Sequence, residues 1–127
     1  EHVHLLEESL EKIKQILSPT GTLIVAVPNC ESYDAAYYKE YWAAYDVPRH
    51  LYHFSPPAMR QLMSSHQLKV YAVKPMWFDS FYVSMLSEKY KTGKSNILRA
   101  FWIGLKSNIK AMSNNEYSSL IYVIKKG

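Results

Sequence analysis

Residues 17–29, LSPTGTLIVAVPN, decide the fold of this chain of 127 residues. The segment opens with a turn, because proline cannot continue a helix and glycine accepts the left-handed backbone that often ends one. Residues 22–28 then form a continuous apolar run without polar alternation. Such a run is typical of a strand buried on both faces, as in a parallel sheet covered by helices. A helix, this turn and a buried strand together predict an α/β unit.

The residues on either side of this segment extend the pattern. Residues 3–17 carry leucines and isoleucine at helical spacing, at positions 6, 10, 13 and 17, which predicts a helix that runs into the turn. After the strand, residues 29–54 show no clear periodicity and are rich in tyrosine, tryptophan, aspartate and histidine. A stretch of that length without a pattern of its own predicts a functional loop or lid.

The rest of the chain predicts further helices and strands. Ser55 followed by two prolines predicts a helix start with a hydroxyl cap, and this helix should end near His66. Residues 77–112 predict two helices, separated near Thr92-Gly93-Lys94. Three strands are expected near 22–28, 68–74 and 119–125. The fold class is therefore α/β, with flanking helices and a helical insert, and residues 1–127 are expected to form part of a single domain.

The composition is that of a globular protein. Hydrophobic residues make up 48% and charged residues 20% of the sequence, and the net charge is only +4. Cys30 is the single cysteine, which excludes an internal disulfide and fits a reducing compartment. No run of 18 apolar residues is present, so we expect a cytoplasmic protein without a membrane span.

Four short pieces of the sequence, taken together, resemble the second half of a class I S-adenosylmethionine-dependent methyltransferase. They are EHV at 1–3, LSPTGTL at 17–23, VPN at 27–29 and DVPRHLYHFS at 46–55. The last piece is the most specific and is similar to a segment of the small-molecule, ubiquinone-type subgroup. The resemblance covers residues 1–76 and the closing strand. It implies a Rossmann-like fold, S-adenosylmethionine as the methyl donor and a small-molecule acceptor.

The family's cofactor loop, an acidic residue followed by G-x-G-x-G, is absent from this sequence. The four glycines, Gly21, Gly93, Gly104 and Gly127, are too scattered to bring backbone close to a cofactor at one turn. The chain also opens on Glu1-His2-Val3-His4, without an initiating methionine. We therefore expect a C-terminal portion whose cofactor-binding half lies outside this sequence. Such a portion should be inactive alone and should self-associate.

Candidate site residues follow from the position of the lid beyond the end of the first strand. If the acceptor is a hydroxyl or an amine, a base must remove its proton, and histidine is the usual choice. The candidate bases are His50, His53 and His2. Asp46 is expected to orient Arg49 or a histidine. The acceptor side is expected to include Asn29, Tyr33, Trp42, Asp46 and Arg49, with Tyr41 and Tyr45 beside them.

Each of these assignments has a structural alternative. His50 and Arg49 would only brace the lid, the aromatic residues would only pack it, and Asn29 would only cap the end of the strand. The resemblance places Glu1 and His2 beside the cofactor. In the family, an E-x-x-E-H stretch can bind a divalent metal, but only its last two residues exist here, so no metal site is assigned.

Residues 95–112 carry a separate signal. Ile97, Phe101, Leu105, Ile109 and Met112 share one helical face, and lysines and an arginine surround it. A basic amphipathic helix of this kind contacts an anionic membrane or a lipophilic acceptor, or it packs on its own domain or a partner subunit. The basic residues form no aromatic-interleaved groove, so no nucleic-acid partner is expected. The alternative to an enzyme is a non-catalytic binding module that uses the same half-fold.

Overall fold

The computed structural model describes residues 1–94 and 96–127, and this part of the chain forms three strands and five α-helices. The strands are β1 (Leu23–Pro28), β2 (Leu68–Pro75) and β3 (Ser119–Lys126). The helices are α1 (Leu6–Ile16), α2 (Tyr33–Tyr38), α3 (Pro56–Ser65), α4 (Asp79–Thr92) and α5 (Ile97–Asn114). The mixed α/β class and the three predicted strands are confirmed. Residue 95, the first of the predicted segment 95–112, lies outside the described residues.

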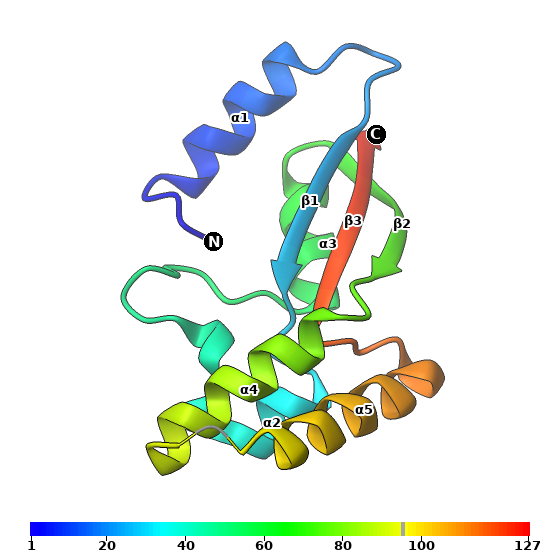
Figure 1. Ribbon diagram of the computed structural model, residues 1–127. Helices are drawn as coiled ribbons and strands as arrows, with labels where there is room; N and C mark the ends of the chain where they lie inside the picture. The colour runs from blue at the N-terminus through cyan, green and yellow to red at the C-terminus, as the bar shows by residue number, and fades with distance from the viewer. Residues whose placement is uncertain (95) are drawn as a thin grey trace.

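The three strands form one sheet in the order β1-β3-β2. The central strand β3 is antiparallel to both neighbours, so β1 and β2 run in the same direction and end at the same edge of the sheet (Figure 1). The apolar run at 22–28 is typical of parallel sheets, but among the described residues all strand pairs of the sheet are antiparallel. The chain returns from the α4–α5 helices as β3 and enters between β1 and β2, which separates the two strands that share a direction.

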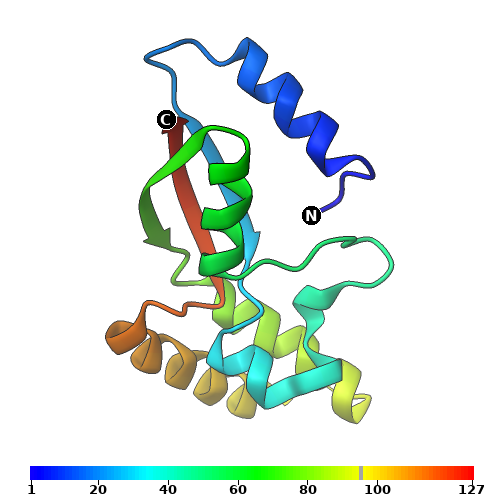
Figure 2. The same ribbon diagram turned by 180° about the vertical axis from the view of Figure 1, so that it is seen from behind.

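One face of the sheet carries the main core. Helix α3 packs across this face (Figure 2), where its Met59 and Met63 meet Leu120 and Ile124 of β3. On the opposite face Ile24 is 66% exposed and Tyr71 is 71% exposed. β1 is thus covered on one face only within the described part of the chain. An apolar run predicts a strand suited to two-sided burial but does not supply the helices that would cover its second face.

Helices α2, α4 and α5 form a layer below the carboxyl ends of β1 and β2 (Figure 1). A second core lies in this layer and includes Tyr38, Trp42, Val83 and Ile103. Helices α4 and α5 approach closely because Gly104 has no side chain: a Cβ atom there would lie 2.9 Å from the Phe81 ring and 3.0 Å from its Cα. None of the described helices combines the length and apolar character needed to cross a bilayer.

The segment between β1 and α3 is more regular than the sequence predicts. It contains α2 and two 3₁₀ turns, at Lys39–Tyr41 and Ala43–Tyr45. The Ser32 side chain caps α2 by accepting a hydrogen bond from the backbone N–H of Ala35 at 3.3 Å. A helix of six residues is too short to show a periodic apolar pattern. The predicted break in the insert is confirmed, since Gly93 ends α4 with a left-handed φ of 74°.

We expect the 127-residue chain to self-associate through the free edge of β1. Among the described residues this strand pairs only with β3, and residues 23–27 contain no charge and no proline. An unguarded edge of free N–H and C=O groups tends to pair with another chain. Sedimentation across a concentration series should therefore show an increase in mass. A compact monomer at the highest concentration would contradict this expectation.

Candidate functional site

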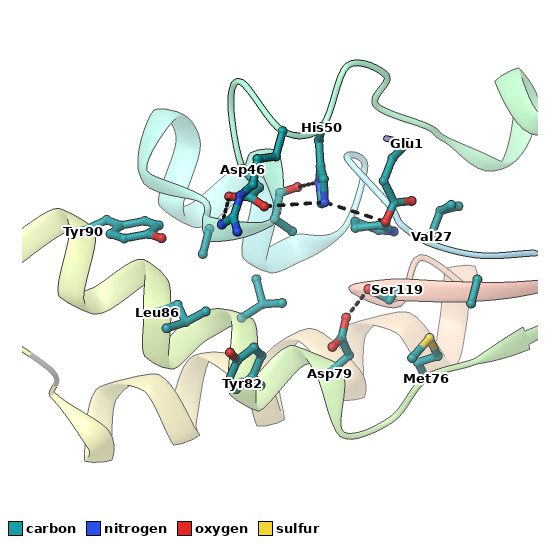
Figure 3. Close-up of a pocket in the computed structure, with 16 residues that line it drawn as sticks. Glu1, Val27, Asp46, His50, Met76, Asp79, Tyr82, Leu86, Tyr90 and Ser119 are labelled. Carbon is teal, nitrogen blue, oxygen red and sulfur yellow. Dashed lines mark hydrogen bonds and ion pairs between the residues drawn. The ribbon is translucent and has the colours of Figure 1, made fainter. Parts of the chain in front are cut away.

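A cavity of about 330 Å³ lies where β1 ends, between that strand, the 43–50 segment and α4 (Figure 3). Ligands of open α/β sheets bind beyond the carboxyl ends of the strands, and this cavity has that position. Its polar wall contains Glu1, Asp46, Arg49 and His50. Its opposite wall is formed by side chains of α4. The cavity is therefore the candidate site for chemistry.

A local turn places His50 at the cavity. Asp46 adopts a left-handed backbone with φ of 40°, which aspartate tolerates better than most residues. Its carbonyl then accepts hydrogen bonds from the backbone N–H groups of Arg49 and His50, at 2.8 and 3.0 Å. The Asp46 carboxylate also pairs with the Arg49 guanidinium at 2.7 Å. The predicted orienting role of Asp46 toward Arg49 agrees with this geometry.

The tautomer of the neutral His50 ring follows from its contacts. Nδ1 lies 2.8 Å from the carbonyl oxygen of Ala44. Because a carbonyl can only accept, we assign the proton of the neutral ring to Nδ1. Nε2 then carries the lone pair, and it lies 3.7 Å from Glu1 Oε1 and 3.8 Å from Asp46 Oδ2. The neutral ring can therefore accept a proton at Nε2.

Helix α4 supplies the wall that the sequence interpretation missed. Tyr82, Leu86 and Tyr90 are spaced four residues apart and line the cavity together (Figure 3). Their spacing puts them on one helical face, and this periodicity is the signal that was present in the sequence. Asp79, at the start of the helix, accepts a hydrogen bond from the Ser119 hydroxyl at the start of β3. Aromatic and aliphatic groups here can contact the apolar part of a small ligand.

Three predicted acceptor-side residues do not line this cavity. Asn29 is buried, and its amide donates to Glu116 Oε2 at 2.6 Å and to the carbonyl of Tyr117 at 3.1 Å. Trp42 is buried in the second core. The Tyr33 ring instead lies beneath the ammonium groups of Lys106 and Lys110, on α5. In this structure the structural alternatives account for these three side chains.

The other predicted histidines differ from His50 in their surroundings. His53 is exposed, lies outside the 330 Å³ cavity, and has Nε2 at 3.0 Å from the carbonyl of Tyr45. His2 is exposed and meets the His50 ring edge to face, with the ring centres 4.6 Å apart. A bracing role in the lid therefore suits His53 better than proton transfer in the cavity.

Glu1 lies at one end of the cavity wall. Its Oε2 atom is buried and has no hydrogen-bond partner among the described residues. Glu1, His2 and His50 each place one ligand atom within 4.8 Å of the others, close enough for the three to share one cation. The lining also carries three carboxylates, of Glu1, Asp46 and Asp79, against the single guanidinium of Arg49. The wall therefore favours a ligand that carries positive charge.

Comparisons of the chain with protein-family models, with curated protein sequences and with solved structures find no match.

Proposed function

We propose that this chain is the C-terminal part of a class I S-adenosylmethionine-dependent methyltransferase, and that the cavity receives a small-molecule acceptor. The observation that carries the proposal is His50, whose Nδ1 is held by the Ala44 carbonyl while Nε2 lies at the cavity between two carboxylates. It belongs to the DVPRH piece of the segment that resembles the family most specifically. A base with a fixed tautomer at a strand-end cavity suits methyl transfer to a hydroxyl or an amine.

The fold is compatible with this proposal. β1 and β2 run in the same direction and follow α1 and α3 in the chain, so they form two α/β units. Many doubly wound folds carry an antiparallel strand in an otherwise parallel sheet, and β3 would be that strand. The open edge of β1 would pair with the strand that precedes it in the complete domain. The open face of the sheet would be covered by helices from the same missing half.

The residues of the wall fit the positively charged end of the cofactor. Three carboxylates line the cavity, and the buried Glu1 Oε2 has no partner among the described residues. Glu1 and His2 would hold this end. When bound, S-adenosylmethionine supplies a methyl group on a sulfonium centre, which a nucleophile can displace in line.

The remaining steps belong to residues of this chain. Tyr82 and Leu86 would hold the acceptor against the opposite wall and exclude water, and such alignment contributes about 7–11 kcal/mol to catalysis. His50 would take the acceptor's proton at Nε2, which lies 3.7 Å from Glu1 Oε1 and 3.8 Å from Asp46 Oδ2. The Ala44 carbonyl would keep the ring oriented throughout.

A binding measurement tests the proposal. We expect this chain alone to bind S-adenosylmethionine very weakly or not at all in calorimetric titration. Its four glycines are dispersed, and Gly104 is packed against Phe81 rather than exposed in a loop. A longer polypeptide that includes the residues encoded upstream of Glu1 should bind the cofactor.

Two outcomes would contradict these expectations, and they differ in meaning. Micromolar binding by the chain alone would show that the essential binding residues lie within this sequence. No binding by the longer polypeptide, while it is folded by circular dichroism, would overturn the methyltransferase proposal.

A further inference from the structure

The outward face of α5 is made of large apolar side chains. Leu98 is 77% exposed and Trp102 is 64% exposed, and Ile97, Phe101, Ile109 and Met112 are exposed with them. The face turned inward consists mainly of small residues, namely Ala100, Gly104, Ser107 and Ala111. The described residues therefore leave this stripe of large apolar side chains uncovered.

Close packing on the inner side determines this orientation. Gly104 lies against the backbone of Phe81. A Cβ atom added to Gly104 would lie 3.0 Å from the Cα atom of Phe81. The Ser107 hydroxyl donates to the buried carboxyl group of Asp34 at 2.6 Å. Rotating α5 to bury its large side chains would break this hydrogen bond. It would also place those large side chains in the close contact with α4. The large apolar side chains of α5 are thus exposed because its other side packs closely on α4 and Asp34.

Helix α4 extends the same surface. An apolar groove of about 570 Å³ lies between the two helices and is lined by Phe78, Phe81, Tyr82, Met85, Ile97 and Phe101, with Ala100 at its base. Phe78 is 86% exposed. We call the exposed side chains of Phe78, Tyr82, Ile97, Leu98, Phe101, Trp102, Ile109 and Met112 the apolar face. Contiguous exposed apolar patches of this kind mark interaction sites.

Apart from Asp79, which is half-buried beside Phe78 and hydrogen-bonded to Ser119, the charges around the apolar face are of one sign. Between residues 80 and 114 the described charged side chains that are exposed are cationic, namely Lys89, Lys91, Lys94, Arg99, Lys106 and Lys110. The one acid of that range, Glu88, is buried beneath Arg99. Arg99, Lys106 and Lys110 follow one another at intervals of seven and four residues, so they form a row along one border of the apolar face.

We propose that the apolar face and its cationic border dock on the surface of an anionic phospholipid membrane, with α5 lying in the plane of the interface. A helix with tryptophan and phenylalanine on one face and lysine and arginine beside it inserts its apolar side chains at the headgroup boundary. The cations then meet the lipid phosphates, each contributing attraction near the surface. This inference does not depend on the methyltransferase proposal, because it shares only Tyr82 with the cavity lining and uses none of the residues assigned to proton transfer or to the cofactor.

Two other occupants are disfavoured by the same observations. A second copy would bring two cationic borders toward each other in an isologous contact, with no exposed acid of the 80–114 range to compensate. A segment of the described chain is not the occupant either, since residues 1–94 and 96–127 leave these side chains exposed.

Vesicle co-sedimentation with the full chain tests the proposal. The protein should co-sediment with phosphatidylcholine vesicles that contain about one third phosphatidylglycerol. Far less protein should co-sediment with pure phosphatidylcholine vesicles. Salt screens the cationic contribution, so raising it should release the protein. A centrifugation without vesicles accounts for self-association through β1. Lipids brominated on the acyl chain close to the headgroup should quench tryptophan fluorescence, and Trp102→Phe should remove most of that quenching.

Matched variants locate the contact. The triple variant Arg99→Gln, Lys106→Gln, Lys110→Gln should weaken partitioning by roughly 10²-fold, at about one kcal/mol per charge. The control Lys12→Gln, Lys69→Gln, Lys125→Gln removes the same charge from α1, β2 and β3 and should change partitioning only a few fold. Leu98→Ser with Trp102→Ser removes exposed apolar groups and should also abolish sedimentation.

Several results would overturn the proposal. They are no sedimentation with anionic vesicles, equal sedimentation with neutral ones, or equal losses in the triple variant and its control. A dimer that dissociates when Leu98 and Trp102 are replaced, without vesicle binding, would assign the face to a second copy. If the variant with serine at positions 98 and 102 fails to fold, the triple glutamine variant of the cationic border and the bromolipid measurement still decide the question.

Discussion

Under the proposed methyltransferase function, replacing His50 with alanine in the longer, cofactor-binding polypeptide is expected to lower the turnover of the acceptor by about 10²–10⁴-fold, which is the usual cost of losing a general base. The expectation rests on a ring that is mostly buried at the cavity, with Nδ1 held by Ala44 and Nε2 facing Glu1 and Asp46. Alanine removes the only ring nitrogen that can accept the proton there. The measurement is the rate of methyl transfer at saturating cofactor and acceptor.

His53→Ala is the matched control for this prediction. His53 belongs to the same segment, but it contacts the Tyr45 carbonyl and lies outside the cavity, so its loss should change turnover only a few fold. Assays with and without a chelator distinguish proton transfer from a cation held by Glu1, His2 and His50. If His50→Ala keeps turnover within a few fold of wild type, the assignment of His50 as the base is wrong.

Replacing Asp34 with alanine is expected to lower the free energy of unfolding by about 3–5 kcal/mol. Its carboxyl group is fully buried and accepts three hydrogen bonds, from Trp42 Nε1 at 2.8 Å, Ser107 Oγ at 2.6 Å and Ser118 Oγ at 2.7 Å. These donors come from the lid, from α5 and from the residue before β3. Alanine leaves all of them buried without their acceptor. Urea unfolding followed by tryptophan fluorescence measures the loss.

Two variants separate the network from general effects. Glu40→Ala removes an exposed acid from the same segment and should change stability by no more than about 0.5 kcal/mol. Asp34→Asn keeps the size of the side chain and one acceptor oxygen, so its loss should be intermediate. An unfolding midpoint for Asp34→Ala equal to that of Glu40→Ala would show that the three hydrogen bonds contribute little to stability.

The candidate site was only partly predictable because two kinds of information were needed. His50, Asp46 and Arg49 lie within five residues of one another, and a local turn brings them together. Trp42 and Asn29 were equally plausible by position, yet both are buried structural residues. Tyr82 and Tyr90 come from a helix more than 30 residues later in the chain. No local pattern indicates which face of that helix meets the lid.

The sequence by itself determined the positions of the three strands and of every described α-helix except the short α2. The patterns that gave these positions are local: apolar runs bounded by proline and glycine, helical spacing and a break at Gly93. Because each pattern involves only a few neighbouring residues, it can be recognised without a structure. The tertiary structure alone decided the pairing of β3 between β1 and β2 and the inward face of α5. Those choices depend on contacts between distant residues, such as Gly104 with Phe81 and Ser107 with Asp34. Apolar periodicity measures how hydrophobic a face is, whereas burial is decided by which face can approach its neighbour most closely.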